Sequence, residues 1–400
     1  SRVSGSSTMN NTGTINISGD NGDENSLSSG IAVIENESTA AASIRAWNNK
    51  VTNNGTINVS GGKANTGMVL IVNAKDDITN TSTGTINVHS EAKKQNIAMR
   101  VDKGKVLTDN PGNPKAINNG KIYLSGDSSM GLVSNDADVT NATGAKIKTA
   151  GGKTIINGIG IVNKGGKLEN EGEIELKGTG DSNNVGIYMA KGTNNPNGTS
   201  TGNITVTGDG STGVLITNGT LNYAGNITAQ GNGVAGIIVG DNDTKSAIVS
   251  AAGTNPGTIT VNNGATAAGV YTDSKNRVRG SYGMVVGKNS KFNQPNTKVD
   301  INVTGKESIG IYAGENSKVT ISKHTVKAYD GAVNYDASDA STITLNGTGN
   351  AETGKKSLLF YNGKNGLGKF LINGTMTATV KGDTDVNKRG TAFYYVSPTP

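Results

Sequence analysis

The sequence predicts an all-β protein, a right-handed parallel β-helix of about twelve coils with three short strands in each and with loop insertions. Three observations predict this solenoid. A seven-residue cassette, Gly55–Gly61, returns along the whole chain. Each good copy is followed by a glycine and a second apolar run. All seven prolines lie outside the cassettes, as expected where a missing N–H would break a strand ladder.

The cassette Gly55-Thr56-Ile57-Asn58-Val59-Ser60-Gly61 has the period of a half-buried strand. Ile57 and Val59 point to one face, and the polar side chains point to the other. The apolar pairs recur as Ile15/Ile17, Ile57/Val59, Ile86/Val88, Ile122/Leu124, Ile174/Leu176, Ile204/Val206, Ile259/Val261, Ile301/Val303 and Ile343/Leu345, with weaker copies at Ile147, Ile227/Ala229 and Met376/Ala378.

Two further strands complete each coil. The second begins with glycine, as in Gly67-Met68-Val69-Leu70, and the third is a short piece that ends in asparagine, as in Asp77–Asn80, Asp138–Asn141 and Lys167–Asn170. The recurring asparagine has two interpretations. It stacks as an inward ladder whose amides bond the neighbouring coils, or it serves as a turn residue.

Composition supports one elongated body with a narrow core. The 400 residues include 58 glycines and only 4% aromatic residues, so branched aliphatic side chains must fill the interior. We expect a regular β-helix over residues 1–321 and a less regular, aromatic-rich continuation over 322–400. The net charge of +6 is spread out, which argues against nucleic acid, and no run approaches the ~18 apolar residues of a membrane span.

The sequence gives little support for a catalytic site or a metal site. The chain has no cysteine and only two histidines, in different coils, and Asp241-Asn242-Asp243 and Asp383-Thr384-Asp385 lack the pattern of a calcium loop. Acidic residues are scattered singly over the turns, whereas β-helical lyases and glycosidases need clustered carboxylates. We therefore expect no enzyme activity, no cofactor and no metal.

Insertions are the best candidates for recognition. Val106–Ala116 and Lys191–Thr201 carry prolines, and the intervals that follow Ile259 and Ile301 are long. The segment Thr272–Tyr282, in the first of these intervals, is the densest basic and aromatic patch, and Arg45-Ala46-Trp47 holds the only tryptophan. Arg, Tyr and Trp are enriched at interface hot spots. The predicted binding residues are Lys275, Arg277, Arg279, Tyr282, Arg45 and Trp47, against the alternative of ordinary solvated loops.

Cassettes of this form followed by Gly310-Ile311-Tyr312-Ala313 resemble the passenger domains of large type V (Va) autotransporter adhesins, in the style of fusobacterial outer-membrane adhesins. The resemblance implies an exported passenger on the cell surface or outer membrane, or released from it. Such passengers bind host receptors, host glycans or other bacteria.

The expected function is therefore a monomeric cell-surface adhesin segment. A polysaccharide-processing β-helix enzyme, a lyase or glycosidase, is one alternative. A phage tail-spike-like protein is another, which would form a trimer.

Overall fold

The computed structural model describes residues 8–19, 28–34, 50–72, 75–92, 94–104, 112–240, 247–250, 257–262, 271–272, 278–304, 308–329, 332–338, 340–362, 367–382, 384–385 and 389–395. The contacts divide the chain into two units. Unit 1 contains residues 1–177 and 187–198, and unit 2 contains residues 178–186 and 199–400. The predicted boundary at residue 322 falls inside one strand of unit 2 and stays a prediction.

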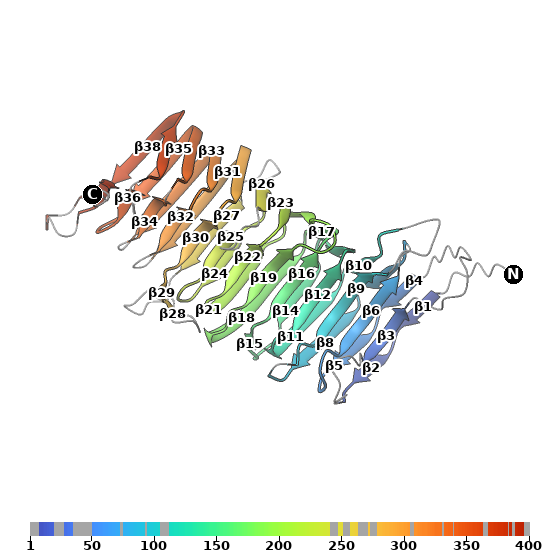
Figure 1. Ribbon diagram of the computed structural model, residues 1–400. Helices are drawn as coiled ribbons and strands as arrows, with labels where there is room; N and C mark the ends of the chain where they lie inside the picture. Colours follow the sequence, from blue (N-terminus) through green and yellow to red (C-terminus); the bar gives the residue numbers. More distant parts are fainter. Residues whose placement is uncertain are drawn as a thin grey trace. The chain divides into compact units, whose positions relative to one another are not determined.

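Each unit is a stack of parallel strands, three to a turn (Figure 1). In unit 1, for example, Lys50–Asn53, Thr56–Val59 and Thr66–Val72 form one turn, and each pairs in parallel with its equivalent in the next turn. The described residues contain strands and turns and no helix. The predicted all-β parallel solenoid is confirmed. No helix in the described part of the chain is long and apolar enough to cross a membrane.

The cassette strands are the first class. They are β2 (Thr14–Ile17), β5 (Thr56–Val59), β8 (Thr85–Ser90), β11 (Lys121–Asp127), β14 (Lys146–Thr149), β18 (Glu173–Asp181), β21 (Ile204–Asp209), β24 (Ile227–Gln230), β27 (Gly257–Asn262) and β38 (Thr375–Val380). A two-residue strand, β15 (Ile155–Ile156), extends the pairing of β11.

The glycine-run strands are the second class, and most begin close to a glycine, whereas β9 (Ile97–Lys103) has Ala98 at the equivalent position. They are β3 (Ser29–Ile34), β6 (Thr66–Val72), β9 (Ile97–Lys103), β12 (Met130–Asn135), β16 (Ile159–Lys164), β19 (Val185–Ala190), β22 (Thr212–Ile216), β25 (Ala235–Val239), β30 (Tyr282–Val286), β32 (Ile309–Ala313), β34 (Val333–Ala337), β36 (Leu358–Asn362) and β39 (Thr391–Tyr395).

The third strands precede the cassette in each turn. They are β1 (Thr8–Asn11), β4 (Lys50–Asn53), β7 (Asp77–Asn80), β10 (Lys115–Asn118), β13 (Asp138–Asn141), β17 (Lys167–Asn170), β20 (Asn197–Ser200), β23 (Gly219–Tyr223), β26 (Ala247–Ser250) and β37 (Lys369–Ile372). In β31 (Lys291–Thr304), β33 (Lys318–Tyr329) and β35 (Thr342–Thr353), a third strand runs on into a cassette strand. A separate antiparallel pair joins β28 (Tyr271–Thr272) and β29 (Val278–Arg279).

Columns of isoleucine form the core, one residue per turn. In unit 1 the column contains Ile57, Ile86, Ile122, Ile147 and Ile174, in register and fully buried. Burial of each such side chain stabilises the fold by about 1.5–3 kcal/mol. In unit 2 the matching column runs through Ile204, Ile227, Ile259 and Ile301. The cassette residues therefore face inward as predicted.

The asparagines that end the third strands form an inward ladder in unit 1. Each side-chain amide donates to the Oδ1 of the next asparagine at 2.8–2.9 Å, in the order Asn11, Asn53, Asn80, Asn118, Asn141 and Asn170. From Asn53 onward these side chains are fully buried. The ladder interpretation is confirmed, since a solvated turn residue would not bond its equivalents in the neighbouring turns.

The prediction of Ile343/Leu345 as a cassette is wrong. The register places Ile301 beside Val326 and Val326 beside Ala351, so the cassettes after Ile301/Val303 are Val326/Ala328 and Ala351/Thr353. Ile343 instead aligns with Val319 and belongs to a third strand. The interval after Ile301 thus contains ordinary turns in place of an insertion. Among the described residues the glycine-run sheet contains 13 strands, so the number of turns differs slightly from the predicted twelve.

The two predicted proline-containing insertions are also partly wrong, because each includes residues of a third strand. Lys191–Thr201 contains β20, which occupies the position of a third strand. Lys115 and Ala116, at the end of the predicted insertion Val106–Ala116, belong to β10. Proline is accommodated just before these strands, where no ladder hydrogen bond is needed from it.

Candidate functional site

The predicted binding residues are distributed over three kinds of position. Arg45, Trp47, Lys275 and Arg277 lie outside the described residues. Arg279 ends β29, and its backbone pairs with Tyr271 in the antiparallel pair. This two-stranded pair is separate from the solenoid sheets, and the segment between its two strands lies outside the described residues. The structure leaves the binding role of these residues a prediction.

Tyr282 does not belong to that interruption. It starts β30 and aligns with Ala235 and Ile309 in the glycine-run sheet. Its ring contacts the ring of Tyr312 edge to face, with centroids 6.1 Å apart. The part of the insertion that the ladder does not need therefore ends before Tyr282, and Tyr282 instead lies on the outer face of a sheet.

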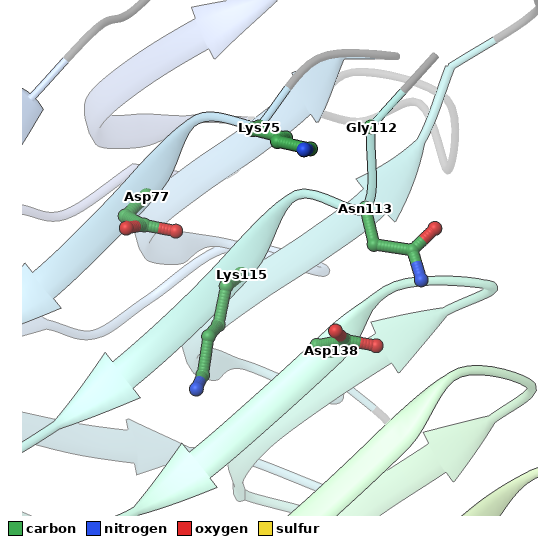
Figure 2. Close-up of a pocket in the computed structure, with 6 residues that line it drawn as sticks. All are labelled: Lys75, Asp77, Gly112, Asn113, Lys115 and Asp138. Carbon is green, nitrogen blue, oxygen red and sulfur yellow. The ribbon is translucent and has the colours of Figure 1, made fainter.

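One surface depression, of about 530 Å³, lies beside the third strands of unit 1 (Figure 2). It is lined by Lys75, Asp77, Gly112, Asn113, Lys115 and Asp138. The register of β7, β10 and β13 places Asp77, Lys115 and Asp138 in one outward column. Lys50 precedes Asp77 in the same column. Positive and negative side chains therefore alternate from turn to turn along this face.

Because lysine and aspartate alternate, the depression is polar, but its positive and negative charges largely offset one another. Burial raises the pKa of Asp77, and Lys115 opposes that effect. The Lys115 ammonium also lies 3.3 Å from the Glu169 carboxylate. Groups of both signs thus line the depression together with the Asn113 side chain, whose Oδ1 accepts from Lys103 Nζ at 3.0 Å, and no single charge dominates.

Glu169 joins three third strands through its carboxylate. It receives a hydrogen bond of 3.0 Å from Thr140 Oγ1 and pairs with Lys115 and Lys167. The hydrogen bond from Lys167 is the largest cause that lowers the pKa of Glu169 to about 2, and those from Thr140 and Lys115 add to it. Glu169 is therefore ionised at neutral pH and serves as an electrostatic link between turns.

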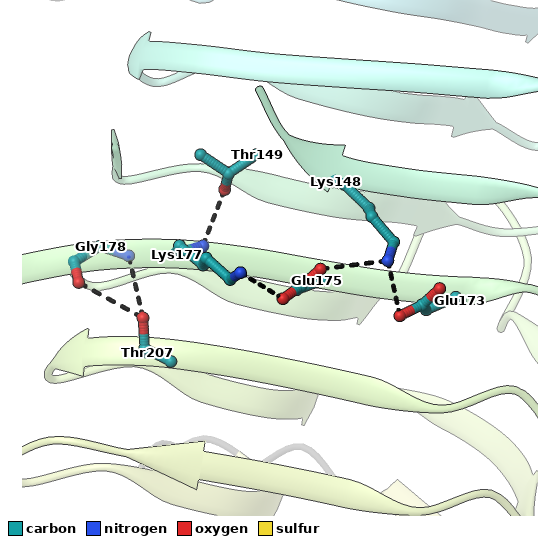
Figure 3. A network of polar contacts seen from close by, with 7 residues as sticks. All are labelled: Lys148, Thr149, Glu173, Glu175, Lys177, Gly178 and Thr207. Carbon is teal, nitrogen blue, oxygen red and sulfur yellow. Dashed lines mark hydrogen bonds and ion pairs between the residues drawn. The ribbon is translucent and has the colours of Figure 1, made fainter. Parts of the chain in front are cut away.

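A second polar network lies on the cassette strands of unit 1 (Figure 3). Lys148 Nζ lies 2.8 Å from Glu173 and 3.1 Å from Glu175, and Lys177 Nζ lies 2.7 Å from Glu175. Burial acts to lower the pKa of Lys148, but the bonds to the two glutamates outweigh it and raise that pKa. These charges satisfy one another, as expected of a solvated solenoid face.

Figure 3 also shows two hydrogen bonds from backbone N–H groups to threonine hydroxyls. The backbone N–H of Lys177 donates to Thr149 Oγ1 at 2.7 Å in unit 1. In unit 2, the backbone N–H of Gly178 donates to Thr207 Oγ1 at 3.2 Å. These threonines hold the backbone of neighbouring strands and offer no reactive group.

Metal-ligating side chains do not gather in the part of the chain that the structure describes. No group of three His, Cys, Asp or Glu side chains there could hold a metal ion. The segment Asp241-Asn242-Asp243, which lacks the pattern of a calcium loop, lies outside the described residues, as does Asp383 of the second such segment.

Sequence reasoning missed one outward acidic residue, Asp336 of unit 2. It occupies β34 between Tyr312 and Tyr361 on the glycine-run sheet. Only 8% of it is exposed, and burial raises the pKa of its carboxyl to about 7. The signal was a lone aspartate at a position where the other glycine-run strands of unit 2 carry Leu, Ile, Val or Tyr.

Comparison with known proteins gives one match. Residues 27–222 match the family model described as the third pectate lyase-like domain of BigA, a family of bacterial surface proteins. The match covers turns of both units and agrees with the β-solenoid architecture. No curated protein and no solved structure matches the chain.

Proposed function

We propose that the chain is a segment of a cell-surface adhesin, a β-helical passenger that binds a host receptor, a host glycan or the surface of another bacterium. The observation that supports this function most directly is a parallel solenoid whose residues 27–222 are similar to a domain of bacterial surface proteins. Export as an autotransporter passenger is part of the proposal, on the strength of the cassettes and glycine runs.

The regular faces of the solenoid are poor sites for discrimination between partners. The outward charges on the third strands and cassette strands of unit 1 are largely paired with one another. A partner that binds there must first break these pairs, and exposed pairs give little energy in return. An interruption of the stack offers side chains that the fold itself does not use.

The segment between β28 and β29 is the proposed contact. It contains Lys275 and Arg277, and Arg279 follows at the end of β29. Cations on such a segment favour an acidic glycan or an acidic receptor patch, where they raise the rate of association and fix orientation.

An adhesion assay tests this proposal. Beads coated with the 400-residue chain should adhere to host cells or partner bacteria more than beads coated with an unrelated protein. The triple variant Lys275→Ala, Arg277→Ala and Arg279→Ala should adhere more weakly. The matched control replaces three exposed lysines of the solenoid, Lys121, Lys146 and Lys153, with alanine and should adhere normally. Equal adhesion of the two variants would remove this segment from the proposal.

A polysaccharide-processing enzyme is the second candidate, favoured by one observation. Asp77 and Asp138 flank Lys115 at the depression of unit 1, and a pair of carboxylates is the arrangement that glycosidases use. Incubation with polygalacturonate and other acidic polysaccharides, followed by absorbance of unsaturated products and by reducing-sugar assay, tests it. Product formation that disappears in Asp138→Asn would establish this candidate in place of a purely binding role.

A further inference from the structure

One outward column of unit 2 is apolar except at a single position. On the glycine-run sheet, strands β22, β25, β30, β32, β34, β36 and β39 align Leu215, Ile238, Val285, Tyr312, Asp336, Tyr361 and Tyr394. A neighbouring outward column contains Ala235, Tyr282, Ile309, Val333 and Leu358. The face therefore combines aliphatic and tyrosine side chains with one carboxylate, a composition typical of interface cores.

Asp336 is almost wholly removed from water although it lies on this outer face. Only 8% of the residue is exposed. Among the described residues, none donates a hydrogen bond to its carboxylate and none forms an ion pair with it. A buried carboxylate without a partner is costly, and an ion pair or hydrogen bond from outside would remove that cost.

Tyr312 and Tyr361, on either side of Asp336, each contact another tyrosine ring on the side away from Asp336. Tyr361 stacks on Tyr394, with centroids 5.7 Å apart and an interplanar angle of 24°. Tyr312 contacts Tyr282 edge to face at 6.1 Å. Because these contacts hold the rings in place, Asp336 lies between two fixed aromatic side chains, about two strand spacings (~10 Å) apart.

We propose that this part of the sheet, defined by Tyr312, Asp336 and Tyr361, is a docking site for an arginine side chain of a protein partner. A guanidinium group is planar and can donate two parallel hydrogen bonds to one carboxylate. It also interacts favourably with aromatic rings, which here lie on either side of the acid. The aliphatic side chains along the column would contact apolar neighbours of that arginine in the partner.

Charge complementarity selects this partner chemistry. An anionic ligand would be repelled by the ionised form of Asp336, and a neutral ligand would leave the charge of that form uncompensated. A lysine ammonium is a compact, strongly hydrated charge that cannot bind the carboxylate in a bidentate manner, so it gains less in an apolar setting. The inference does not depend on the proposed segment between β28 and β29, because the two sites use different residues.

Small probes test the site on the full 400-residue chain. Binding of Nα-acetyl-arginine amide would be compared with that of Nα-acetyl-citrulline amide, which has the same shape without the charge, by titration calorimetry or NMR. We expect the arginine probe to bind about tenfold or more tightly than the citrulline probe, the scale of a hydrogen bond to a charged group. The Nα-acetyl-lysine amide with a free ammonium should bind more weakly than the arginine probe.

Asp336→Asn should abolish the preference for the arginine probe, with normal folding checked by its thermal transition. The matched control is Glu315→Gln, which neutralises a half-exposed acid that pairs with Lys288 in the same unit. It should keep the preference. Equal binding of the arginine and citrulline probes to the unaltered chain, equal binding of arginine and lysine probes, or an unchanged preference in Asp336→Asn would each overturn the inference. These outcomes say nothing about cell adhesion, which the assay above tests separately.

Discussion

The side-chain nitrogen of Asn80 donates a hydrogen bond of 2.9 Å to the Oδ1 of Asn118, its equivalent one turn further along. Both residues are fully buried. Because the Oδ1 of Asn80 also accepts from Asn53 at 2.8 Å, the polar interior of unit 1 is a chain of bonds that links successive turns. Such a network stabilises a solenoid only while every member has its partner.

Asn80→Ala should therefore destabilise the protein by about 2–3 kcal/mol, since it leaves buried partners on both sides without a bond. Asn58→Ala is the matched control. Asn58 also bonds its equivalents, Asn16 at 2.7 Å and Asn87 at 2.8 Å, but on the outer face. Its loss should cost less than about 1 kcal/mol because water replaces the bonds. Urea denaturation of both variants measures the difference, and equal destabilisation would contradict a special role of the buried ladder.

Glycine in the second strands is required by close packing between turns. A Cβ atom on Gly131 would lie 2.4 Å from the carbonyl oxygen of Gly160 and 2.9 Å from Ile147 Cγ2. Gly131→Ala should thus destabilise the protein by about 3 kcal/mol, the upper range for overpacking. Gly151→Ala is the control, because nothing lies within 4 Å of its Cβ position. Comparable midpoints of unfolding for the two variants would show that the turns can move apart at little cost.

The inward assignment of the cassette is tested in unit 2. Ile204 is fully buried, and the next residue, Thr205, points outward and aligns with Thr228. Ile204→Asp should cost more than about 4 kcal/mol, since it places an unpaired charge between turns that cannot rearrange independently. Thr205→Asp should change stability by less than about 1 kcal/mol. Normal thermal stability of Ile204→Asp would refute the assignment.

Period-2 alternation was enough to predict strands, their inward faces and the stacking of turns. It could not tell a cassette strand from a third strand, because both alternate apolar and polar residues. Ile343/Leu345 was thus placed in the wrong class, whereas Val326/Ala328 was missed because it lacks the flanking glycines. Only the register between turns, a long-range property, separates the two classes.

The candidate sites were harder to predict than the fold. Whether Asn80 faces inward depends on its equivalents in other turns, so its own segment was compatible with a turn as well. Asp336 is informative only beside Tyr312 and Tyr361, which lie in neighbouring turns. Its chemistry arises from stacking, and a search for clustered acidic residues along the sequence does not find it.

His324 is a buried titratable group in unit 2. It lies in β33, is 1% exposed, and contacts the Tyr335 ring edge to face at 6.0 Å. Neither ring nitrogen has a hydrogen-bond partner among the described residues. Gly349 lies against the ring, so that a Cβ there would be 2.3 Å from His324 Cε1. Burial lowers the pKa of His324 to about 4, and the nearby Asp300 only partly opposes this effect.

Because the buried imidazole of His324 stays neutral in the folded protein, it makes the free energy of unfolding decrease as pH falls. Between pH 6.5, the ordinary pKa of histidine, and about pH 4, the unfolded chain binds a proton at residue 324 that the folded chain does not, so the free energy of unfolding falls as pH falls. His324→Phe removes this contribution. The loss of stability between pH 7 and pH 5, measured by urea denaturation, should be smaller in His324→Phe than in the unaltered chain by about 2 kcal/mol. Other groups titrate alike in both proteins, so parallel pH profiles would show that His324 is protonated as easily in the folded state as in the unfolded one.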